Sequence, residues 1–241
     1  ELSKLLPEPL KIVVGVSGGP DSRLTFEVLK DFYTHHNRDI QLLIVAHFNH
    51  GQRKESDKEQ QQIFRWYENH HIYYNDTKPM KWLKETSLRL HRMEFFTEVS
   101  KKENALYVAT GHNLDDRIET SFMNLLRGTS LIGLSNMNFS DYRDGVFHIR
   151  PLISLQKSYI QAICDKWKIA YFLDPTNNDS LLTMRNALRN DIFPQLRALS
   201  HQDKWYDSWS MIYEQLEKKY GKWDSNRVWL KVREAHPQRE S

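Results

Sequence analysis

The sequence predicts an α/β protein with a mostly parallel sheet, helices on both faces and a small helical appendage at the C-terminus. One observation is that short apolar, β-branched runs alternate with segments of helical periodicity, an order typical of parallel sheets. Another is that polar or glycine-containing loops follow the apolar runs, at the edge where such sheets bind ligands. Strands are expected over residues 12–16, 41–48, 72–74, 105–109 and 170–173, and helices over 24–32, 56–69, 83–102, 114–127, 155–167 and 200–220.

Each expected element has a local reason. The β-branched run from Ile12 to Val16 stops at a Ser-Gly-Gly sequence, and apolar residues at helical spacing follow it. Residues 41–48 have the nearly unbroken apolar character of a buried strand, and a polar helix pattern follows them. The run over 105–109 leads into a helix that glycine closes at Gly128. The apolar run over 170–173 ends at an Asp-Pro pair and is therefore expected to be the last strand.

Composition and charge narrow the class of protein. The chain has 241 residues, 34 Lys+Arg and 31 Asp+Glu, so its net charge of +3 does not by itself indicate a polyanionic partner. No window of 18 uncharged apolar residues exists, which excludes a membrane span. The single cysteine, Cys164, excludes an internal disulfide and a Cys-rich metal site, and it favours a cytoplasmic protein. No obligate protein partner is indicated.

Two domains are expected, a catalytic domain over residues 1–197 and the helical appendage over 198–241. The composition changes after Pro194, and four of the seven tryptophans follow it: Trp205, Trp209, Trp223 and Trp229. The chain begins with Glu1 rather than Met, and little of it follows Pro194, so we expect a short form or a partial chain.

The loop from Ser17 to Ser22, with the sequence SGGPDS, is the most informative feature. Two glycines after a strand allow backbone N–H groups to turn toward an anion, and the following helix N-terminus adds its positive dipole. The Asp21 carboxylate beside a triphosphate requires a bridging Mg²⁺. The pattern is neither a Walker A loop nor GxGxxG, and a plain turn with a helix cap is the alternative. The candidate ATP-binding residues of the loop are Ser17, Gly18, Gly19, Pro20, Asp21 and Ser22.

A second motif, from Gly111 to Thr120, stands where a strand passes into a helix at the same sheet edge. Asp116 and Glu119 are three residues apart, so their carboxylates share one helical face and repel each other unless a cation or the helix N-terminus compensates. An amine or metal between them is the functional interpretation. A solvated acidic first turn is the alternative.

Two further groups of residues are candidates. The sequence His47-Phe48-Asn49-His50 lies at the end of the second expected strand, although an isolated histidine at such a place is more often structural than catalytic. Arg185 and Arg189 are one helical turn apart, a spacing that allows two guanidinium groups to hold a phosphate.

In this order the motifs resemble tRNA(Ile)-lysidine synthetase, a family of N-type PP-loop ATP pyrophosphatases. The family pattern contains SGGxDS, HxNHGLR, an arginine-bearing helix, GHxxDDxxET, LLRGxGLxGL, RPL and RNxxR. Residues 11 to 197 carry the resemblance, with Arg89 and Arg92 on the helix and Arg150-Pro151-Leu152 for RPL. The sequence departs from the pattern at several positions, including Arg23, which stands where small or apolar residues are commoner.

The resemblance implies ATP-dependent ligation of L-lysine to the wobble cytidine of tRNA(Ile), with ATP and Mg²⁺ as cofactors and release of AMP and pyrophosphate. It implies catalytic and metal-binding roles for Asp21 and Asp116, and lysine binding by Asp116 and Glu119. ATP contacts are also implied for His47, Asn49, His50 and Gly111. tRNA contacts are implied for a set of arginines, namely Arg89, Arg92, Arg127, Arg185 and Arg189.

Two alternatives share some of these features. Another PP-loop enzyme, such as a tRNA thiolase or an amide-forming synthetase, has the same glycine loop. However, sulfur transfer needs cysteines that this chain lacks, and no amidotransferase domain is visible. A catalytically inactive module that binds tRNA or nucleotide is the other alternative, and the intact Ser17, Asp21, Asp116 and Glu119 argue against it.

Overall fold

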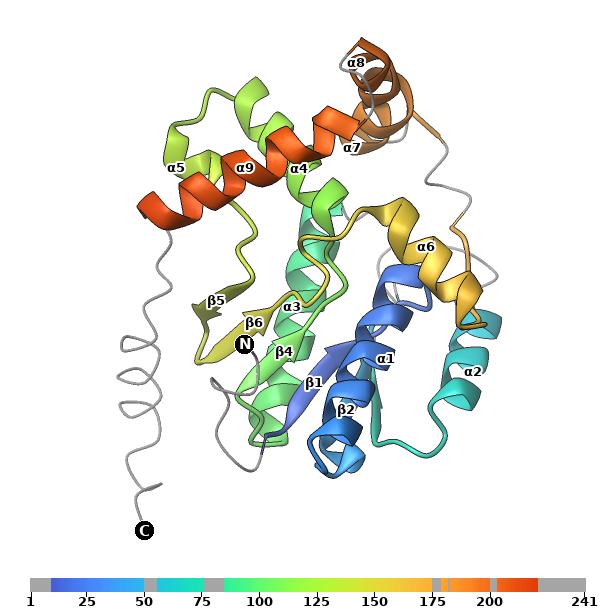
Figure 1. Cartoon of the computed structure of the whole chain (residues 1–241). Helices are drawn as coiled ribbons and strands as arrows, with labels where there is room; N and C mark the ends of the chain where they lie inside the picture. Colours follow the sequence, from blue (N-terminus) through green and yellow to red (C-terminus); the bar gives the residue numbers. More distant parts are fainter. Residues whose placement is uncertain are drawn as a thin grey trace.

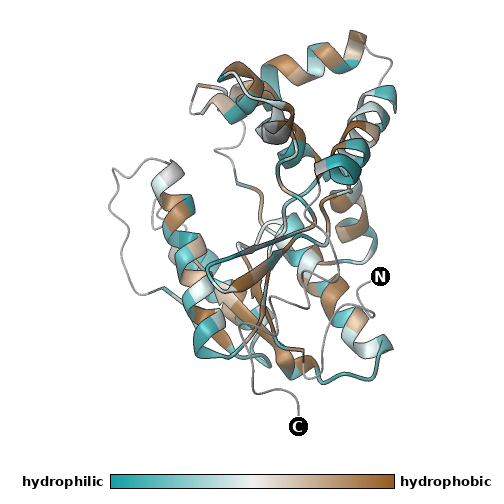
Figure 2. Ribbon diagram, turned by 90° about the vertical axis from the view of Figure 1, so that its left-hand side faces the viewer, coloured by the Kyte–Doolittle hydropathy of each residue, from teal (hydrophilic) through white to brown (hydrophobic). Residues whose placement is uncertain are grey.

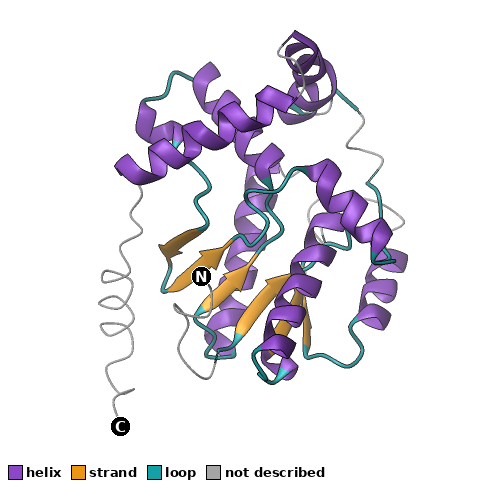
Figure 3. Cartoon of the chain, viewed as in Figure 1, coloured by secondary structure: helices purple, strands orange, loops and turns teal. Residues whose placement is uncertain are grey.

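The computed structural model describes residues 10–49, 56–75, 85–174, 179–181, 183–199 and 203–220. A six-stranded sheet forms the centre of the molecule, with the strand order β3-β2-β1-β4-β6-β5 (Figures 1 and 3). All neighbouring strands are parallel except β5 and β6, which pair antiparallel. The strands are β1 (Ile12–Gly15), β2 (Leu43–His47), β3 (Ile72–Tyr74), β4 (Tyr107–Ala109), β5 (Ser140–Arg143) and β6 (Val146–Ile149). The α/β class with a mostly parallel sheet is therefore confirmed.

Helices cover both faces of the sheet. Alternate residues of β1 point to opposite faces, so that Ile12 and Val14 pack with α1 and α2, whereas Val13 packs with α3. Apolar colouring accordingly gathers in the strands, and the helices show hydrophilic turns as well (Figure 2). The helices that cover the sheet are α1 (Pro20–His35), α2 (Ser56–Trp66), α3 (Glu85–Lys102) and α6 (Lys157–Lys166). A short 3₁₀ helix, η2 (Ile40–Leu42), precedes β2.

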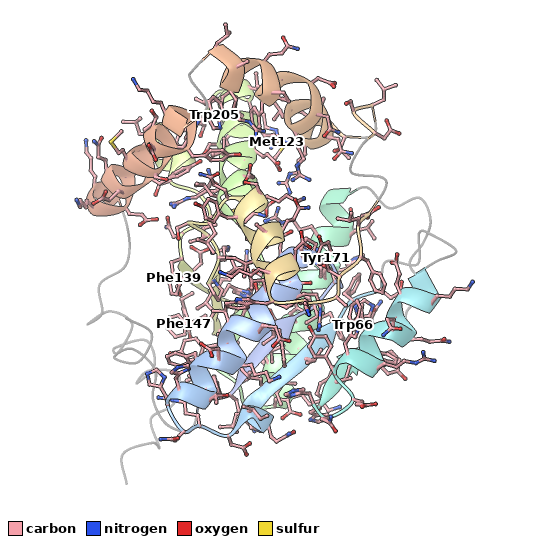
Figure 4. The ribbon with its side chains drawn as sticks, turned by 45° about the vertical axis from the view of Figure 1, so that its right-hand side comes forward. Trp66, Met123, Phe139, Phe147, Tyr171 and Trp205 are labelled. Carbon is pink, nitrogen blue, oxygen red and sulfur yellow. The ribbon has the colours of Figure 1, made fainter. Side chains whose placement is uncertain are left out.

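A group of helices continues beyond the sheet around α4 (Leu114–Leu126) (Figure 1). Leu114 and Ile118 of α4 share an apolar core with Tyr213 and Leu216 of the last helix, and Met123 and Trp205 pack against this core (Figure 4). The other members are α5 (Leu131–Leu134), α7 (Met184–Ala187), the π-helix η4 (Leu188–Ile192), α8 (Phe193–Leu199) and α9 (Asp203–Tyr220). The helical character of residues 203–220 agrees with the expected appendage, while the division of the chain at residue 197 remains a prediction.

The strand expected over residues 170–173 is wrong. These residues form an extended segment outside the sheet, because the Phe172 N–H donates to the Gly18 carbonyl and not to a neighbouring strand. The sheet instead gains β5 and β6, a hairpin that the sequence analysis did not predict. Its turn has positive φ at Asp144 (56°) and Gly145 (88°), and an Asp-Gly pair is a strong signal for such a turn.

Within the described ranges, none of the helices is long and apolar enough to cross a membrane.

Candidate active site

The glycine loop, residues 17–22, joins β1 to α1 at the carboxyl end of the strand. Gly18 has a φ of +83°, which glycine adopts without strain, and Gly19 is the N-cap of α1. The Ser22 hydroxyl fixes the turn because it accepts from the Ser17 N–H at 3.1 Å and donates to the Gly19 carbonyl at 3.0 Å. Asp21 lies in the first turn of α1, where the helix dipole favours negative charge. The arrangement directs a helix N-terminus and glycine amides to one edge of the sheet.

Gly111 brings the loop after β4 into direct contact with the glycine loop. A Cβ atom on Gly111 would lie 2.7 Å from the Asp21 carbonyl carbon and 2.8 Å from the Ser22 nitrogen. Both are backbone atoms of the first turn of α1, so only glycine allows this approach. The two motifs that the sequence analysis assigned to one sheet edge are therefore in contact.

Asn113 connects the carboxylates of the two motifs, and the sequence analysis missed its role. Its side-chain amide donates to Asp21 Oδ1 at 2.8 Å, and its Oδ1 accepts from the Asp116 N–H at 3.0 Å. Its own N–H donates to Asp116 Oδ2 at 3.1 Å, which completes a capping box at the start of α4. Only 1% of Asn113 is exposed. The signal was present in the sequence, because Asn directly before a helix is a preferred N-cap.

Asp21 and Asp116 lie close enough for their charges to interact. Burial, followed by the charge of Asp116, raises the pKa of Asp21 above its usual value. Burial alone would also raise the pKa of Asp116, but the interaction with His112, the guanidinium groups of Arg185 and Arg189 and a backbone hydrogen bond from Asn113 hold it below its usual value. Asp116 is therefore ionised at neutral pH. A cation beside Asp21 would offset the charge of Asp116 and so stabilise the ionised form of Asp21.

The acidic face of α4 is paired with arginines and is not a solvated first turn. Glu119 is 1% exposed and receives two hydrogen bonds from Arg189, at 2.6 and 2.8 Å, while Arg185 Nε lies 3.4 Å from its Oε2. Arg189 also lies 3.5 Å from Asp116. Burial and the charge of Asp116 raise the pKa of Glu119 to about 7, against the stabilising effect of Arg189. Asp115 lies outside this group, since it accepts from the Lys157 N–H and the Tyr206 hydroxyl.

Four of the five predicted tRNA-binding arginines gather near Asp116. Burial, followed by the charges of Arg185 and Arg92, lowers the pKa of Arg89 to about 10. Arg185 and Arg189 complete the group through their contacts with Glu119. The fifth, Arg127, is the exposed C-cap of α4 and lies at the opposite end of that helix. The site thus has a positively charged flank made by α3, α7 and η4.

A family model described as a PP-loop domain matches residues 2–196. The chain belongs to the PP-loop family. This match confirms the PP-loop resemblance that the glycine loop predicted, and it implies that the domain binds ATP.

The chain of this PP-loop protein is also similar to curated relatives. A tRNA(Ile)-lysidine synthase of Streptococcus agalactiae is 33% identical over 209 residues, which cover 86% of this chain and 46% of the relative. The tRNA(Ile)-lysidine synthase of Clostridium tetani is 31% identical over 202 residues, which cover 80% of this chain and 42% of the relative. The chain therefore spans less than half the length of these relatives.

A solved structure shares the PP-loop fold. The U34-tRNA thiolase NcsA from Methanococcus maripaludis, described with its [4Fe-4S] cluster, matches 89% of this chain and 74% of its own with a TM-score of 0.69. Its sequence identity is 20%, so the match supports the architecture alone.

The remaining predicted residues of the PP-loop site lie at the carboxyl end of β2 (Leu43–His47) and directly after it. His47 is buried, its Nδ1 lies 2.8 Å from the Val16 carbonyl, and burial lowers its pKa. Asn49 donates its side-chain amide to Gln60 of α2 at 2.6 Å. His47 is thus beside the residue that precedes the glycine loop, whereas the Asn49 amide is directed to α2. His50 lies outside the described residues.

Proposed function

We propose that this PP-loop domain catalyses the ATP-dependent ligation of L-lysine to the wobble cytidine of tRNA(Ile). In the first step the cytosine carbonyl oxygen attacks the α-phosphorus of ATP, the bond to the bridging oxygen breaks, and pyrophosphate leaves. In the second step the ε-amine of lysine attacks the adenylated carbon, AMP leaves with the oxygen, and the nitrogen loses its proton. The proposal transfers to this chain the activity named for its relatives.

The observation that carries the proposal is the Asn113 bridge between Asp21 and Asp116. It unites a loop suited to a triphosphate with an acid-base cluster suited to an amine. A triphosphate on the glycine loop would lie near this bridge, since helix N-termini bind phosphate groups through their amides and Asp21 is in the first turn of α1. A ligase that joins an amine to an adenylated base needs both functions in one place.

Asp21 and Asp116 are the residues that would hold Mg²⁺. No group of three or more His, Cys, Asp or Glu side chains suited to a metal occurs among the described residues. A pair of carboxylates is nevertheless sufficient for Mg²⁺, which takes most of its other ligands from phosphates and water. The raised pKa of Asp21, caused in part by Asp116, fits a site where a cation relieves repulsion. When bound, Mg²⁺ neutralises developing charge on the leaving pyrophosphate.

The amino acid would bind on the acidic face of α4. Asp116 and Glu119 offer two carboxylates to an ammonium group, and Arg189 and Arg185 now contact Glu119. An incoming ammonium would therefore exchange with a guanidinium or share the carboxylates with it. A guanidinium released from Glu119 is available to a tRNA phosphate. We propose that Arg89, Arg92, Arg185 and Arg189 bind tRNA near the reacting base, and that Arg127 contacts it farther away.

Sulfur transfer, the reaction named for the thiolase neighbour, fits this chain poorly. Its one cysteine, Cys164, is buried, and its Sγ lies 3.6 Å from the Pro20 carbonyl. Burial and then the charge of Asp21 raise the pKa of Cys164 to about 11, so the thiol is protonated at neutral pH. A nucleophilic sulfur carrier needs an accessible thiolate.

The products of ATP turnover test the proposal. With tRNA and lysine, the wild-type protein is expected to release AMP and pyrophosphate, and Asp21→Ala is expected to abolish turnover because it removes a carboxylate from the phosphate side. Asp31→Ala is the matched control, since Asp31 is an exposed residue of the same helix. Release of ADP and orthophosphate as the sole products would contradict the proposed reaction.

A further inference from the structure

Phe172 covers Gly18, the residue of the glycine loop that has a positive φ. Its backbone N–H donates to the Gly18 carbonyl at 2.8 Å. Its ring lies 2.8 Å from the point where a Cβ atom on Gly18 would stand, and Gly18 has a φ of +83°. Phe172 thus contacts Gly18 through both backbone and side chain. Because glycine has the most backbone freedom of any residue, an external contact is needed to fix one conformation there.

Two residues, Trp66 of α2 and Arg23 of α1, hold Phe172 and the segment that carries it. The Trp66 ring lies 4.8 Å from the Phe172 ring at an interplanar angle of 30°. The Arg23 guanidinium lies 4.5 Å from the centre of the Trp66 ring on its way to the Ala170 carbonyl, to which Nε donates at 2.9 Å. Figure 4 shows Trp66 between α1 and α2. Arg23 is 7% exposed, so both contacts are shielded from water.

These contacts connect the residue after the glycine loop, Arg23, with Gly18 inside the loop. Arg23 follows Ser22 directly, reaches the carbonyl of Ala170, and so fixes the segment that carries Phe172 back to Gly18. The stacking on Trp66 and the hydrogen bond to Ala170 both need the planar guanidinium of an arginine at position 23. An apolar residue at position 23 would pack against Trp66 without a bond to the segment.

We propose that Phe172, held by Trp66 and Arg23, is a positioning residue that fixes the glycine loop in its phosphate-binding conformation. A loop that is already ordered loses less entropy when its amides bind an anion, so the affinity for ATP is higher. The effect on ATP rests on the proposed function, whereas the effect on loop order does not.

Loop order and ATP binding are to be measured separately on the whole chain. Hydrogen–deuterium exchange of the amides of residues 17–19, 21 and 22 reports loop opening, and calorimetry with Mg²⁺–ATP reports affinity. Phe172→Ala is expected to speed exchange in the loop and to weaken ATP binding, each about ten-fold, because a residue that pre-organises a site acts on both. Phe172→Tyr is expected to restore both. Arg23→Met is expected to act in the same direction, and the double variant to lose less than the product of the two single losses.

Tyr171→Ala is the matched control. Tyr171 is the adjacent aromatic residue, but it packs against the core of α6 and its hydroxyl donates to Asp165. It should leave loop exchange and ATP affinity unchanged. Equal losses in Tyr171→Ala and Phe172→Ala, or wild-type exchange in Phe172→Ala, would overturn the inference. If the wild type itself fails to bind ATP, the proposed function is wrong, and the exchange data still decide the role of Phe172.

Discussion

Replacing Gly111 by alanine tests the contact between the two loops at the sheet edge. The added Cβ would lie 2.7 Å from the Asp21 carbonyl carbon, 2.8 Å from its oxygen and 2.8 Å from the Ser22 nitrogen. Reaching an ordinary contact of 3.4 Å requires a shift of about 0.7 Å in backbone that begins α1. Gly111 does not have a positive φ, so the cost is steric. Overpacking of this kind costs about 1–3 kcal/mol of unfolding free energy.

The same shift should damage function more than stability. It moves Asp21 relative to Asn113 and Asp116, and a displacement of about 1 Å at a reacting centre can cost on the order of 100-fold in rate. Urea unfolding and the rate of AMP release measure the two effects. Gly19→Ala is the comparison without steric overlap, because its Cβ would meet no atom closer than 3.7 Å; it should lose only the stability that a change from Gly to Ala costs at the N-cap of α1. If Gly111→Ala matched the wild type in both measurements, the close approach of the loops would have no consequence and the reasoning would be refuted.

Three other changes follow from the site and the sheet. Asn113→Ala removes the N-cap of α4 and the bond to Asp21, so urea unfolding should show a loss of about 1 kcal/mol with a large fall in AMP release. Asn113→Ser should restore stability, because Ser also caps helices, but not turnover. Glu119→Gln leaves Arg189 and Arg185 without their main anion. Steady-state kinetics should show at least a ten-fold rise in the KM for lysine and a smaller change in the KM for ATP. Ten-fold corresponds to about 1.4 kcal/mol, the minimum expected for a lost charged partner. An unchanged lysine KM would leave the acidic face with a structural role only. His148 is 1% exposed, and burial followed by the charges of Arg143 and Arg150 lowers its pKa to about 3. Between about pH 6.5 and 3 the unfolded chain therefore binds a proton that the folded protein does not, so stability falls as pH falls through this window, by about 1–2 kcal/mol between pH 7 and 5. His148→Leu should lack this part of the loss in urea unfolding at the two pH values, and an identical pH dependence in both proteins would contradict it.

Local patterns were sufficient for most of the fold. The β-branched run of β1 and the helix after it follow directly from periodicity, and burial patterns agree with them. The apolar run over 170–173 failed because a segment that packs against a loop and an aromatic helix face has the same composition as a buried strand. The β5–β6 hairpin was missed although Asp144-Gly145 is a strong turn signal, since β5 has the polar sequence SDYR and lacks the apolar run by which the other strands were predicted.

The part of the site that lies in local sequence patterns was predicted, and the contacts between distant residues were not. The glycine loop and Gly111 belong to a common sheet edge that alternating strands and helices determine. The partner of Glu119 was not predictable, because Arg189 is 70 residues away and charge alone does not distinguish it from the other cationic side chains of the sequence. Arg127 was grouped with the other arginines, but it follows the last residue of a 13-residue helix whose first turn holds Asp116. A rise of about 1.5 Å per residue separates the two by roughly 16 Å.

Transfer of lysine to tRNA tests the central claim most directly. The wild-type protein is to be incubated with radiolabelled L-lysine, ATP and bulk bacterial tRNA, and the labelled tRNA species identified by hybridisation. The proposed function predicts acid-stable label in isoleucine tRNA alone, dependent on ATP, with one AMP released for each lysine bound. No label in any tRNA, from a protein that binds ATP and tRNA, would contradict it.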